Sequence, residues 1–537
     1  MARRAFAAAV LAWLWIAATS HAVARPQASG NDAVFTVAGQ VVDLTGAPVP
    51  GARVRVSSGG WVVADAVTGQ DGEFTLQLPP GVLDVTATAH DMAAASARVR
   101  VPRPSDARDP LQLVLGAAVF SAAVTVAAPV VHPNGTEGST SLVTSEAIGL
   151  VPARALDETL GATPGFSLFR RSPSRTANPT AQGVSLRGLG ASGASRALVM
   201  ADGFPANDPF GGWVYWSRLP VVSIERVEVA RGGRSERHGA DALGGVVGIV
   251  TSQASRPFAG RFLVEAGSRR TGKLSGFVGM QRGPWSWVAS GEAGRSGRAP
   301  VVAAEQRGPV DTPAGSDHAA GLFGVGWAPA PAFTATVRLN PFGEQRANGT
   351  PLQRNDTRSA QGSAVTGGAA RGGQWEVRAW GQWTRFRQTF SVVSRDRASE
   401  ALAARQRVES TAVGGRAAWD RVFGPAALGA GVEMRQVEAD NLEGPAGGSP
   451  GEARTVGGRQ RGAAVFGRVS MPFGPGVRVD AGVRWEAWRN TPSHLPGGSR
   501  DESRFSPRLT VTWTPAQGVV THASGYGAFR APTLNEL

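Results

Sequence analysis

The C-terminal half of the chain alternates apolar and polar residues with a period of two. Residues 477–486 read Val-Arg-Val-Asp-Ala-Gly-Val-Arg-Trp-Glu, and residues 375–379 and 508–513 repeat the arrangement. This period places apolar side chains on one face of a strand and polar side chains on the other. Residues 258–537 are therefore predicted to form many strands of about ten residues each, with one face in an apolar phase.

Gly-rich and polar stretches separate these strands. Residues 340–358 and 441–461 are expected to be long loops. A soluble sandwich would give the same alternation locally. However, about a dozen such strands with long loops favour a membrane barrel that is apolar outside and polar inside.

Two shorter regions precede the alternating half. Residues 34–115 consist of short β-type runs separated by turn residues such as Asp71-Gly72 and Pro80-Gly81. They predict a small antiparallel sandwich whose closing strand is Leu111 to Leu115. Residues 141–252 read as mixed α and β.

The mixed region contains one helix signal and one strand signal. A helix is expected to begin at Ser145-Glu146, to include Leu156 and Leu160, and to stop in residues 161–165. Residues 197–200 read as a strand.

The first 24 residues read as an export signal. Arg3 and Arg4 precede an apolar run from Ala5 to Ala18, and residues 22–24 form a small-residue cleavage site. The run is too short for a spanning helix, which takes about 20 apolar residues, and no later stretch comes close. An exported protein without a helical membrane anchor is expected.

The amino-acid composition excludes several kinds of site and partner. There are no cysteines, so disulfides, thiolate metal sites and cysteine nucleophiles are excluded. The 71 glycines and 15 tryptophans, with only 18% charged residues, fit a large β structure. The net charge of +14 could suit nucleic acid, but the basic residues are spread along the chain. We expect them to line a polar barrel interior or to face lipid phosphates, with no nucleic-acid partner.

Catalytic and cofactor motifs are weak. The seven histidines, among them His90, His132, His238 and His318, lack metal-site spacing, and no nucleophile elbow is found. Residues 188–193 spell a dinucleotide fingerprint, but no strand–turn–helix context surrounds them, so a flexible loop is expected. The chain is predicted to be no enzyme and to hold neither a metal nor a cofactor.

Four motifs in residues 183–250 carry a family resemblance. They are Gly-Val-Ser-Leu-Arg-Gly at 183–188, Ala-Leu-Val-Met-Ala-Asp-Gly-Phe-Pro at 197–205, Ile-Glu-Arg-Val-Glu-Val-Ala-Arg-Gly at 224–232, and the Gly-rich run 239–250. Their order and spacing resemble the plug of TonB-dependent receptors. The sequence departs from that pattern at His238, where Tyr is usual, and at Gly248, where Asn is usual.

The flanking regions resemble parts of the same architecture. Residues 34–115 are similar to the carboxypeptidase regulatory-like domain, a transthyretin-like β-sandwich that we expect to be an accessory module without peptidase chemistry. Residues 505–509 and 528–537 resemble barrel segments that lie well before the C-terminus in the receptor family. The resemblance implies a 22-stranded barrel, of which half to three-fifths would be present, so the chain is expected to be truncated.

The fold class implied is mainly β. It comprises a transthyretin-like β-sandwich at 34–115, a mixed α/β plug at 141–252, and part of a 22-stranded transmembrane antiparallel β-barrel at 258–537. A signal peptide at 1–24 and a linker at 116–140 complete the expected organisation.

The linker contains an isolated apolar, β-branched segment. Its position before the plug resembles a TonB box, which would add a strand to the periplasmic TonB energy-coupling protein. The alternative is an ordinary last strand of the sandwich. The residues of the expected box are Ala122, Ala123, Val124, Thr125, Val126 and Ala127.

The plug motifs imply a latch. In the family such Arg and Glu residues pair at the plug–barrel boundary, and glycines let the backbone pack closely; a solvated strand face is the alternative. The latch and structural residues expected on this basis are Arg187, Gly188, Asp202, Gly203, Glu225, Arg226, Glu228, Arg231, Gly232, Gly244 and Gly245.

Ligand contacts are expected from the plug apices. Aromatic and Arg side chains suit a bulky anionic ligand through stacking and charge pairing, although the same rings could pack against the barrel wall. The candidates are Arg170, Arg171, Phe204, Asn207, Trp213, Tyr215 and Trp216.

The resemblance implies an outer-membrane receptor that imports a scarce, bulky ligand with energy supplied through TonB. Its plug and N-terminal domain would face the periplasm, and its partners would be TonB, outer-membrane lipid and a metal chelate or other small molecule. A ferric siderophore is expected first, and cobalamin or an oligosaccharide are the alternatives. The rival from another class is an exported soluble binding or adhesion protein.

Overall fold

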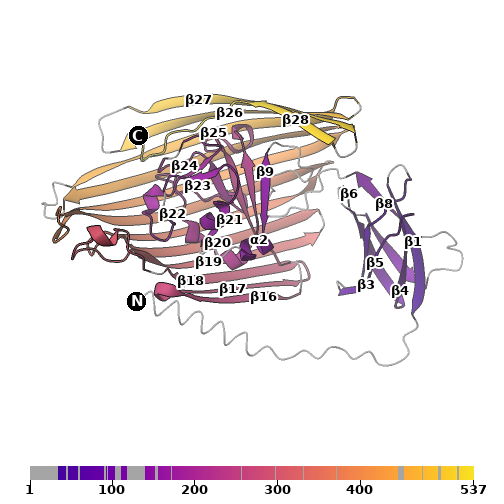
Figure 1. Ribbon diagram of the computed structural model, residues 1–537. Coiled ribbons are helices and arrows are strands. Elements are labelled where there is room, and N and C mark those ends of the chain that lie inside the picture. Colours follow the sequence, from indigo (N-terminus) through magenta and orange to yellow (C-terminus); the bar gives the residue numbers. More distant parts are fainter. Residues whose placement is uncertain are drawn as a thin grey trace. The chain divides into compact units, whose positions relative to one another are not determined.

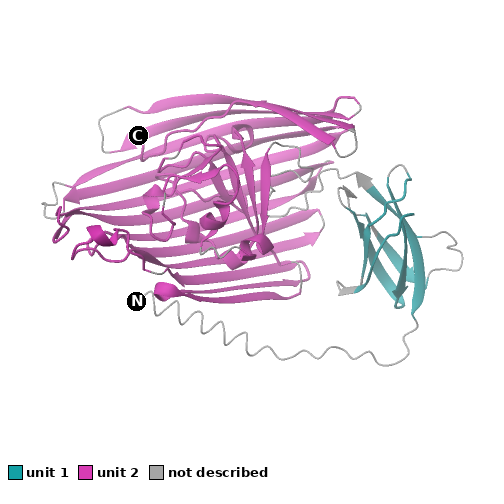
Figure 2. Ribbon diagram, in the orientation of Figure 1, with its two compact units in different colours: residues 1–121 teal, residues 122–537 magenta. Residues whose placement is uncertain are grey.

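The computed structural model divides the chain into two compact units, residues 1–121 and 122–537 (Figure 2). The structure describes residues 34–43, 46–58, 61–89, 92–93, 95–102, 111–117, 139–150, 155–170, 172–190, 192–254, 257–296, 298–330, 332–370, 372–445, 453–474, 476–493, 498–516 and 519–537. Strands dominate both units, which confirms the predicted mainly β class.

The first unit is a sandwich of two four-stranded sheets, ordered β4-β1-β8-β6 and β3-β2-β5-β7. Inward residues alternate along its strands, as Val54 and Val56 do in β2, and they form one apolar core. The predicted closing strand is β8, which pairs in parallel with β1. The strands are β1 (Phe35–Asp43), β2 (Arg53–Ser58), β3 (Trp61–Val67), β4 (Glu73–Leu78), β5 (Gly81–Thr88), β6 (Met92–Ala93), β7 (Ala95–Val101) and β8 (Leu111–Ala117).

The second unit begins with the plug, here residues 139–254. A five-stranded mixed sheet, ordered β13-β12-β15-β14-β9, packs its apolar face against short helices and the hairpin β10-β11. The elements are β9 (Thr140–Thr144), α2 (Ser145–Leu150), α3 (Leu156–Leu160), β10 (Phe166–Leu168), η1 (Pro179–Ala181), β11 (Val184–Leu186), β12 (Leu198–Ala201), β13 (Phe204–Pro205), η2 (Trp216–Arg218), η3 (Val221–Ser223), β14 (Ile224–Arg231), α4 (Ser235–His238) and β15 (Gly245–Thr251).

The single helix expected from Ser145 through Leu160 is wrong. Two short helices, α2 and α3, take its place, and Pro152 stands between them in the sequence. Proline lacks the N–H that a helix interior needs and pushes the preceding residue towards extended conformations. The strand predicted at residues 197–200 is present as β12.

The rest of the second unit is one antiparallel sheet of thirteen strands in sequence order, which we call the wall (Figure 1). Its strands are β16 (Ala259–Gly267), β17 (Thr271–Arg282), β18 (Trp285–Arg295), β19 (Gly315–Ala330), β20 (Phe333–Ala347), β21 (Arg354–Ala370), β22 (Gly373–Val393), β23 (Glu400–Phe423), β24 (Ala426–Pro445), β25 (Arg454–Pro472), β26 (Val477–Ser493), β27 (Arg500–Ala516) and β28 (Val519–Tyr526). Two further 3₁₀ turns are η4 (Ser268–Arg270) and η5 (Ala304–Gln306).

The two faces of the wall differ as the period of two predicts. One face carries buried polar residues such as Gln361, Thr384 and Ser410, and the plug lies against it. The other face exposes large apolar residues such as Val337, Val413 and Trp485. This is the pattern of a sheet with a polar inside and a lipid-facing outside.

The predicted strand length and loops are wrong in detail. β23 has 24 residues, and the expected loop at 340–358 shrinks to residues 348–353 because β20 and β21 continue into it. Likewise, β24 reaches Pro445 and β25 begins at Arg454 inside the expected loop at 441–461. Cross-strand hydrogen bonds do not require an apolar face, so pairing continues after the apolar positions end.

The connections differ at the two ends of the wall. Short segments such as 283–284 and 424–425 join strands at one end, whereas 296–314, 348–353 and 394–399 join them at the other. In outer-membrane barrels short turns face the periplasm and longer loops face outwards. We therefore call the ends the turn end and the loop end. Among the described residues, no helix is long and apolar enough to cross a membrane.

Candidate functional site: the plug against the wall

A buried ion pair ties the central plug sheet to the wall. Asp202, in the turn between β12 and β13, pairs with Arg338 of β20, and both side chains are almost fully buried. Arg338 Nη1 also donates to Thr251 Oγ1 at 2.7 Å, and Thr251 donates its own hydroxyl to Asp202 Oδ2 at 2.7 Å. Losing one partner of such a pair typically costs 3–5 kcal/mol because the other charge stays buried.

A second contact is made by the turn around α4. Asp241 accepts a hydrogen bond from Arg435 of β24 at 2.5 Å, and Glu236 lies 3.8 Å from Arg508 of β27. Arg508 also donates to the carbonyl of Gly233 at 3.0 Å. This end of the plug is therefore held by arginines from separate wall strands.

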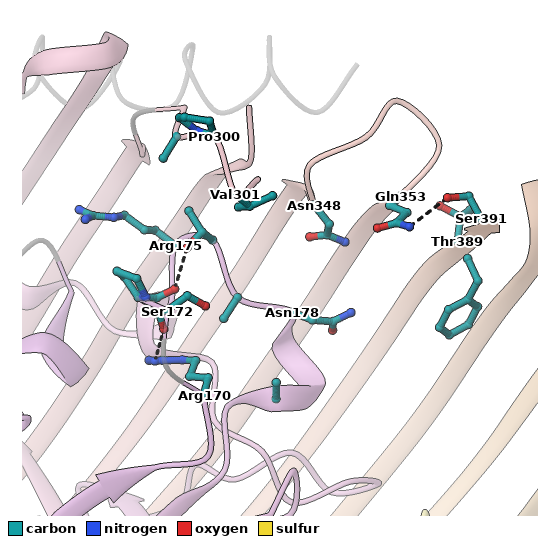
Figure 3. A pocket seen from close by; sticks show the side chains of 16 residues that line it. Arg170, Ser172, Arg175, Asn178, Pro300, Val301, Asn348, Gln353, Thr389 and Ser391 are labelled. Carbon is teal, nitrogen blue, oxygen red and sulfur yellow. Dashed lines mark hydrogen bonds between the residues drawn. The ribbon is translucent and has the colours of Figure 1, made fainter. Parts of the chain in front are cut away.

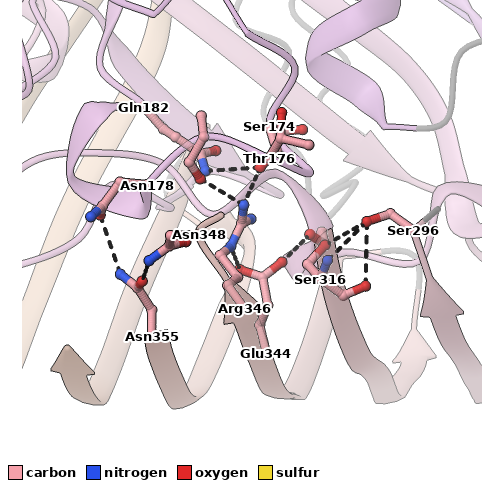
Figure 4. A network of polar contacts seen from close by, with 12 residues as sticks. Ser174, Thr176, Asn178, Gln182, Ser296, Ser316, Glu344, Arg346, Asn348 and Asn355 are labelled. Atoms are coloured by element: carbon pink, nitrogen blue, oxygen red, sulfur yellow. Dashed lines mark hydrogen bonds and ion pairs between the residues drawn. The ribbon is translucent and has the colours of Figure 1, made fainter. Parts of the chain in front are cut away.

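In a third contact, wall residues form hydrogen bonds with the plug loop at residues 172–178 (Figure 4). Arg346 of β20 donates to the carbonyls of Ser174 and Ala177, the latter at 2.8 Å, and its Nε bonds Glu344 at 2.7 Å. Glu344 in turn accepts from Ser217 Oγ at 3.0 Å. Asn355 donates to Asn178 at 3.3 Å and extends the same network to β21.

Aromatic packing fills the space beneath this loop. Trp213 and Tyr215 are buried and contact the wall rings Phe386 and Phe342, with centroids 6.0 and 5.8 Å apart. Phe210 packs on Trp213 in the same cluster. These rings exclude water from the plug–wall boundary.

One carboxyl inside this cluster is unusual. Asp208 accepts backbone N–H bonds from Phe210 and Gly211 at 3.0 and 2.9 Å, and the Tyr215 hydroxyl at 3.2 Å. Burial raises the pKa of Asp208 to about 6, although these bonds and Arg218 favour its charged form. The group is poised to change charge near neutral pH.

A cavity of about 710 Å³ opens between the plug and the loop end of the wall (Figure 3). The lining residues from the plug are Arg170, Ser172, Pro173, Arg175, Thr176, Ala177, Asn178 and Ala181, and those from the wall strands and their loops are Ala299, Pro300, Val301, Asn348, Gln353, Thr389, Phe390 and Ser391. Its lining mixes amide and hydroxyl side chains with apolar ones such as Val301 and Phe390, and Gln353 donates to Ser391 at 3.0 Å. The volume lies within the range of small-molecule sites.

The two described arginines of the cavity are paired with acids of α3. Arg170 forms a buried pair with Asp157 and donates to the carbonyl of Ser172 at 3.1 Å. Burial raises the pKa of Asp157 despite Arg170 beside it. Arg175 lies 3.8 Å from Glu158, and both remain partly exposed. The cavity therefore has a mixed polar and apolar lining, and its described arginines are each paired with an acid.

The expected latch residues fall in different places. Asp202 pairs with the wall as described, and a Cβ on Gly203 would meet the guanidinium of Arg378 of β22. Arg226 bridges Glu225 and Glu228 within β14 at 2.9 and 2.8 Å. The wall contacts described above involve Asp202, Asp241 and Glu236, whereas Glu225 and Glu228 both pair with Arg226.

The remaining latch positions lie mostly in contacts within the plug. Arg231 donates to the Pro164 carbonyl and to Ser139 and Ser141. Arg187 and Gly188 occupy an exposed turn with positive φ, and Gly232 approaches Tyr526 of β28. Gly244 precedes β15 and Gly245 begins it, and a Cβ on either residue would meet a backbone carbonyl. Glycine at these two positions avoids both collisions.

The expected ligand residues lie mostly in internal contacts. Phe204 packs on Val365 of β21, and Asn207 accepts the Val199 N–H at 2.8 Å. Trp213 and Tyr215 face the wall, and Trp216 packs on Phe166 in the plug core. Arg170 is the expected residue that lines the cavity. Arg171, the expected coupling segment 122–127 and the expected signal peptide lie outside the described residues.

Sequence reasoning missed the wall partners. Arg338, Arg346 and Arg435 each lie on the polar face of a wall strand. In the sequence, such a residue can be found as an arginine that alternates with the apolar residues of its strand. The missing information was the plug residue that each one meets, because the pairs join residues more than ninety positions apart.

Comparisons with known proteins follow the same division of the chain. The TonB-dependent receptor plug domain matches residues 133–246, the TonB-dependent receptor-like β-barrel matches 305–537, and the carboxypeptidase regulatory-like domain matches 36–114. A vitamin B12 transporter, BtuB, of Photobacterium profundum is 28% identical over 159 residues, which cover 29% of this chain and 25% of that protein. A ferric enterobactin receptor of Pseudomonas aeruginosa is 32% identical over 127 residues, 21% of this chain and 16% of that one.

Solved structures share the fold. The unliganded ferric citrate transporter FecA has a TM-score of 0.58 at 17% identity, covering 73% of this chain and 63% of that one. The ferric yersiniabactin uptake receptor FyuA from Yersinia pestis has a TM-score of 0.59 at 14% identity, covering 73% and 64%. The chain thus spans less than two thirds of the length of each of these relatives. With plug and barrel models matched in order on a shared fold, the chain belongs to the TonB-dependent receptor family of outer-membrane proteins and carries a carboxypeptidase regulatory-like domain before its plug.

Proposed function

We propose that this protein is the receptor of an energy-coupled importer, which captures a scarce ligand outside the cell and passes it through the outer membrane. The observation that carries the proposal is the plug, bound to the polar face of the wall by the buried pair of Asp202 and Arg338. A contact that costs several kcal/mol to break keeps a pore shut at rest and needs an external energy source to open.

The cavity at the loop end supplies a capture site that is linked to the rest of the plug. Ser174 lies in the plug loop that borders the cavity. Its hydroxyl donates to Asp157 at 2.7 Å, and its carbonyl accepts a hydrogen bond from Arg346. Arg170 joins the cavity to Asp157 of α3. A ligand that displaces residues 170–178 would therefore disturb both the wall contact and α3.

The signal would then reach the N-terminal side of the plug. α3 follows β9 and α2, which follow the linker that contains residues 122–127. We propose that these six residues add a strand to TonB, which pulls on the plug with energy from the inner-membrane proton gradient.

A ferric siderophore is the ligand proposed first. The partly exposed guanidinium of Arg175 suits the oxygen-rich anionic surface of such a chelate, and Arg170 lines the same cavity while paired with Asp157. Ferric siderophore receptors are among the relatives and among the solved structures that share the fold.

Cobalamin or an oligosaccharide is the second candidate. The cavity arginines are paired with Asp157 and Glu158, and amide and hydroxyl groups such as Asn178 and Gln353 outnumber charged ones. Such groups suit a neutral ligand with many hydrogen-bonding positions. A vitamin B12 transporter is among the relatives.

The experiment that separates these ligands measures the native full-length protein in outer membranes of its host, grown with ample iron and under iron starvation. Strong induction on starvation supports ferric-siderophore import. An unchanged amount shifts the proposal to cobalamin or carbohydrate. Recovery of the protein as a soluble periplasmic product would overturn the importer and favour a binding or adhesion protein.

A further inference from the structure

An arginine patch covers the outer face of three neighbouring wall strands. Register pairs Arg358 of β21 with Arg385 of β22, and Arg387 of β22 with Arg407 of β23. Directly opposed residues lie on the same face of a sheet, and alternate residues along a strand share that face. The patch therefore comprises Arg354, Arg358, Arg385, Arg387, Arg405 and Arg407.

The patch faces away from the plug. Residues of the opposite parity, such as Thr384, Phe386 and Val408, are buried, and Phe386 packs on plug residue Trp213. The guanidinium side chains of Arg358 and Arg407 are 50% and 48% exposed.

The patch carries excess positive charge. On this face, the described residues of β21, β22 and β23 include two carboxylates near the arginines, Asp356 and Glu409. Asp356 lies 3.8 Å from Arg358, and Glu409 pairs with Arg407. Acidic side chains resume on β24, where Asp440 stands opposite Glu409. Six arginines against two carboxylates leave a formal charge of +4.

The position of the patch identifies its environment. On β22 the same face is apolar or small from Trp375 to Trp383, and Arg385 is the next outward residue. The ten residue steps from Trp375 to Arg385, at about 3.4 Å each, span roughly 34 Å, and a strand tilt of about 40° reduces this to about 26 Å, which is close to the height of the apolar band of an outer-membrane protein. The arginines thus begin where the hydrocarbon ends, on the loop end of the wall.

The opposite boundary has another character. At the turn end the outer face carries an aromatic row, in which Trp285 stacks on Trp327 and Phe333 contacts Trp375, with centroids 5.9 and 6.2 Å apart. Aromatic rings suit the membrane interface in general. Clustered arginines suit phosphate, because the guanidinium binds phosphate oxygens in a bidentate manner.

We propose that this patch binds the headgroup phosphates of a phosphorylated glycolipid in the outer leaflet. The apolar residues beside it, such as Trp383 and Val413, are 39% and 53% exposed and would contact the acyl chains. Charge complementarity and position at the edge of the apolar band select a membrane lipid over a soluble anion.

The test uses the purified full-length protein in neutral detergent, titrated with bis-phosphorylated lipid A and with the same lipid after enzymatic removal of its phosphates. Binding is read by native mass spectrometry. The wild-type protein is expected to bind the phosphorylated lipid and to lose most of that binding when the phosphates are removed. Equal binding of both lipids overturns the proposal without any variant.

A charge-matched pair of variants locates the site. Arg387→Gln/Arg407→Gln should weaken phosphorylated lipid binding roughly 30-fold, which is about 1 kcal/mol for each arginine. Arg282→Gln/Arg421→Gln removes two arginines at the turn end and should change affinity less than about twofold. Equal losses in the two variants, or none in the first, contradict the assignment of the phosphates to this patch.

Discussion

At the scale of single residues, the plug is held by a few charged groups that water does not reach. Asp202 and Arg338 pair across the boundary while Thr251 bonds both of them. The pair stabilises the closed plug only as long as both partners remain. Exposed pairs such as Arg489 and Asp501, also on the wall, lack this property because solvent screens them.

Asp202→Ala should therefore loosen the plug. Arg338 would be left buried without its carboxylate, and we expect a loss of about 3 kcal/mol in apparent stability. Thermal unfolding followed by tryptophan fluorescence measures it. Asp501→Ala is the matched control and should leave the melting temperature unchanged. If both variants melt like the wild type, the pair does not hold the plug.

Asp208 should give stability a pH dependence. Its pKa is about 6 in the fold and 3.8 ordinarily, so between these values the native state holds a proton that the unfolded state has lost. The contribution of Asp208 to the free energy of unfolding is therefore largest below about pH 4 and is lost as the pH rises through about 6. Asp208→Asn keeps an acceptor oxygen for the Phe210 and Gly211 amides. In this variant the melting temperature should depend less on pH between pH 4 and 6 than it does in the wild type. An unchanged slope in that variant would show that another group titrates.

At the scale of elements, the periodicity of the sequence predicts much of the fold. The period of two predicts the wall and its two faces, and turn residues predict the N-terminal sandwich. Strand ends are not predicted, because β23 and β24 stay paired where the apolar pattern has stopped. The cavity is not predicted either, since it forms where residues 170–178 meet loops more than a hundred positions later.

The arginine patch could not be predicted from the sequence either. They look scattered along the sequence, but a hairpin register brings Arg387 and Arg407 directly opposite each other. Sequence spacing gives parity along one strand, and only the register shows which parities meet across strands.

The expected coupling segment remains a prediction at this scale. Val124→Pro should abolish uptake while leaving ligand binding at the cell surface intact, because proline removes an N–H that an added strand needs. Val124→Thr keeps that N–H and β-branching and should retain uptake. Both activities are measured with radiolabelled ligand on energised cells. Normal uptake by the proline variant would place the coupling segment elsewhere.

At the scale of the whole molecule, import requires the plug to move relative to the wall. The plug meets β18 through Val221 and Glu292, β20 through Arg338 and Arg346, and β27 through Arg508. These contacts are distributed around the plug, so opening a path through the wall means breaking a subset of them while others act as a hinge.

The most direct test of that requirement is a reversible cross-link. A Cβ placed on Gly482 of β26 would lie 3.8 Å from the Glu236 Cβ of α4, which suits a disulfide, and the chain contains no other cysteine. Uptake of ⁵⁵Fe-siderophore or ⁵⁷Co-cobalamin is measured in energised cells that carry full-length Glu236→Cys/Gly482→Cys, before and after reduction, beside each single variant. If import requires the plug to move relative to the wall, the oxidised double variant binds ligand but does not import it, and reduction restores import. Equal import by the oxidised and reduced forms would contradict it.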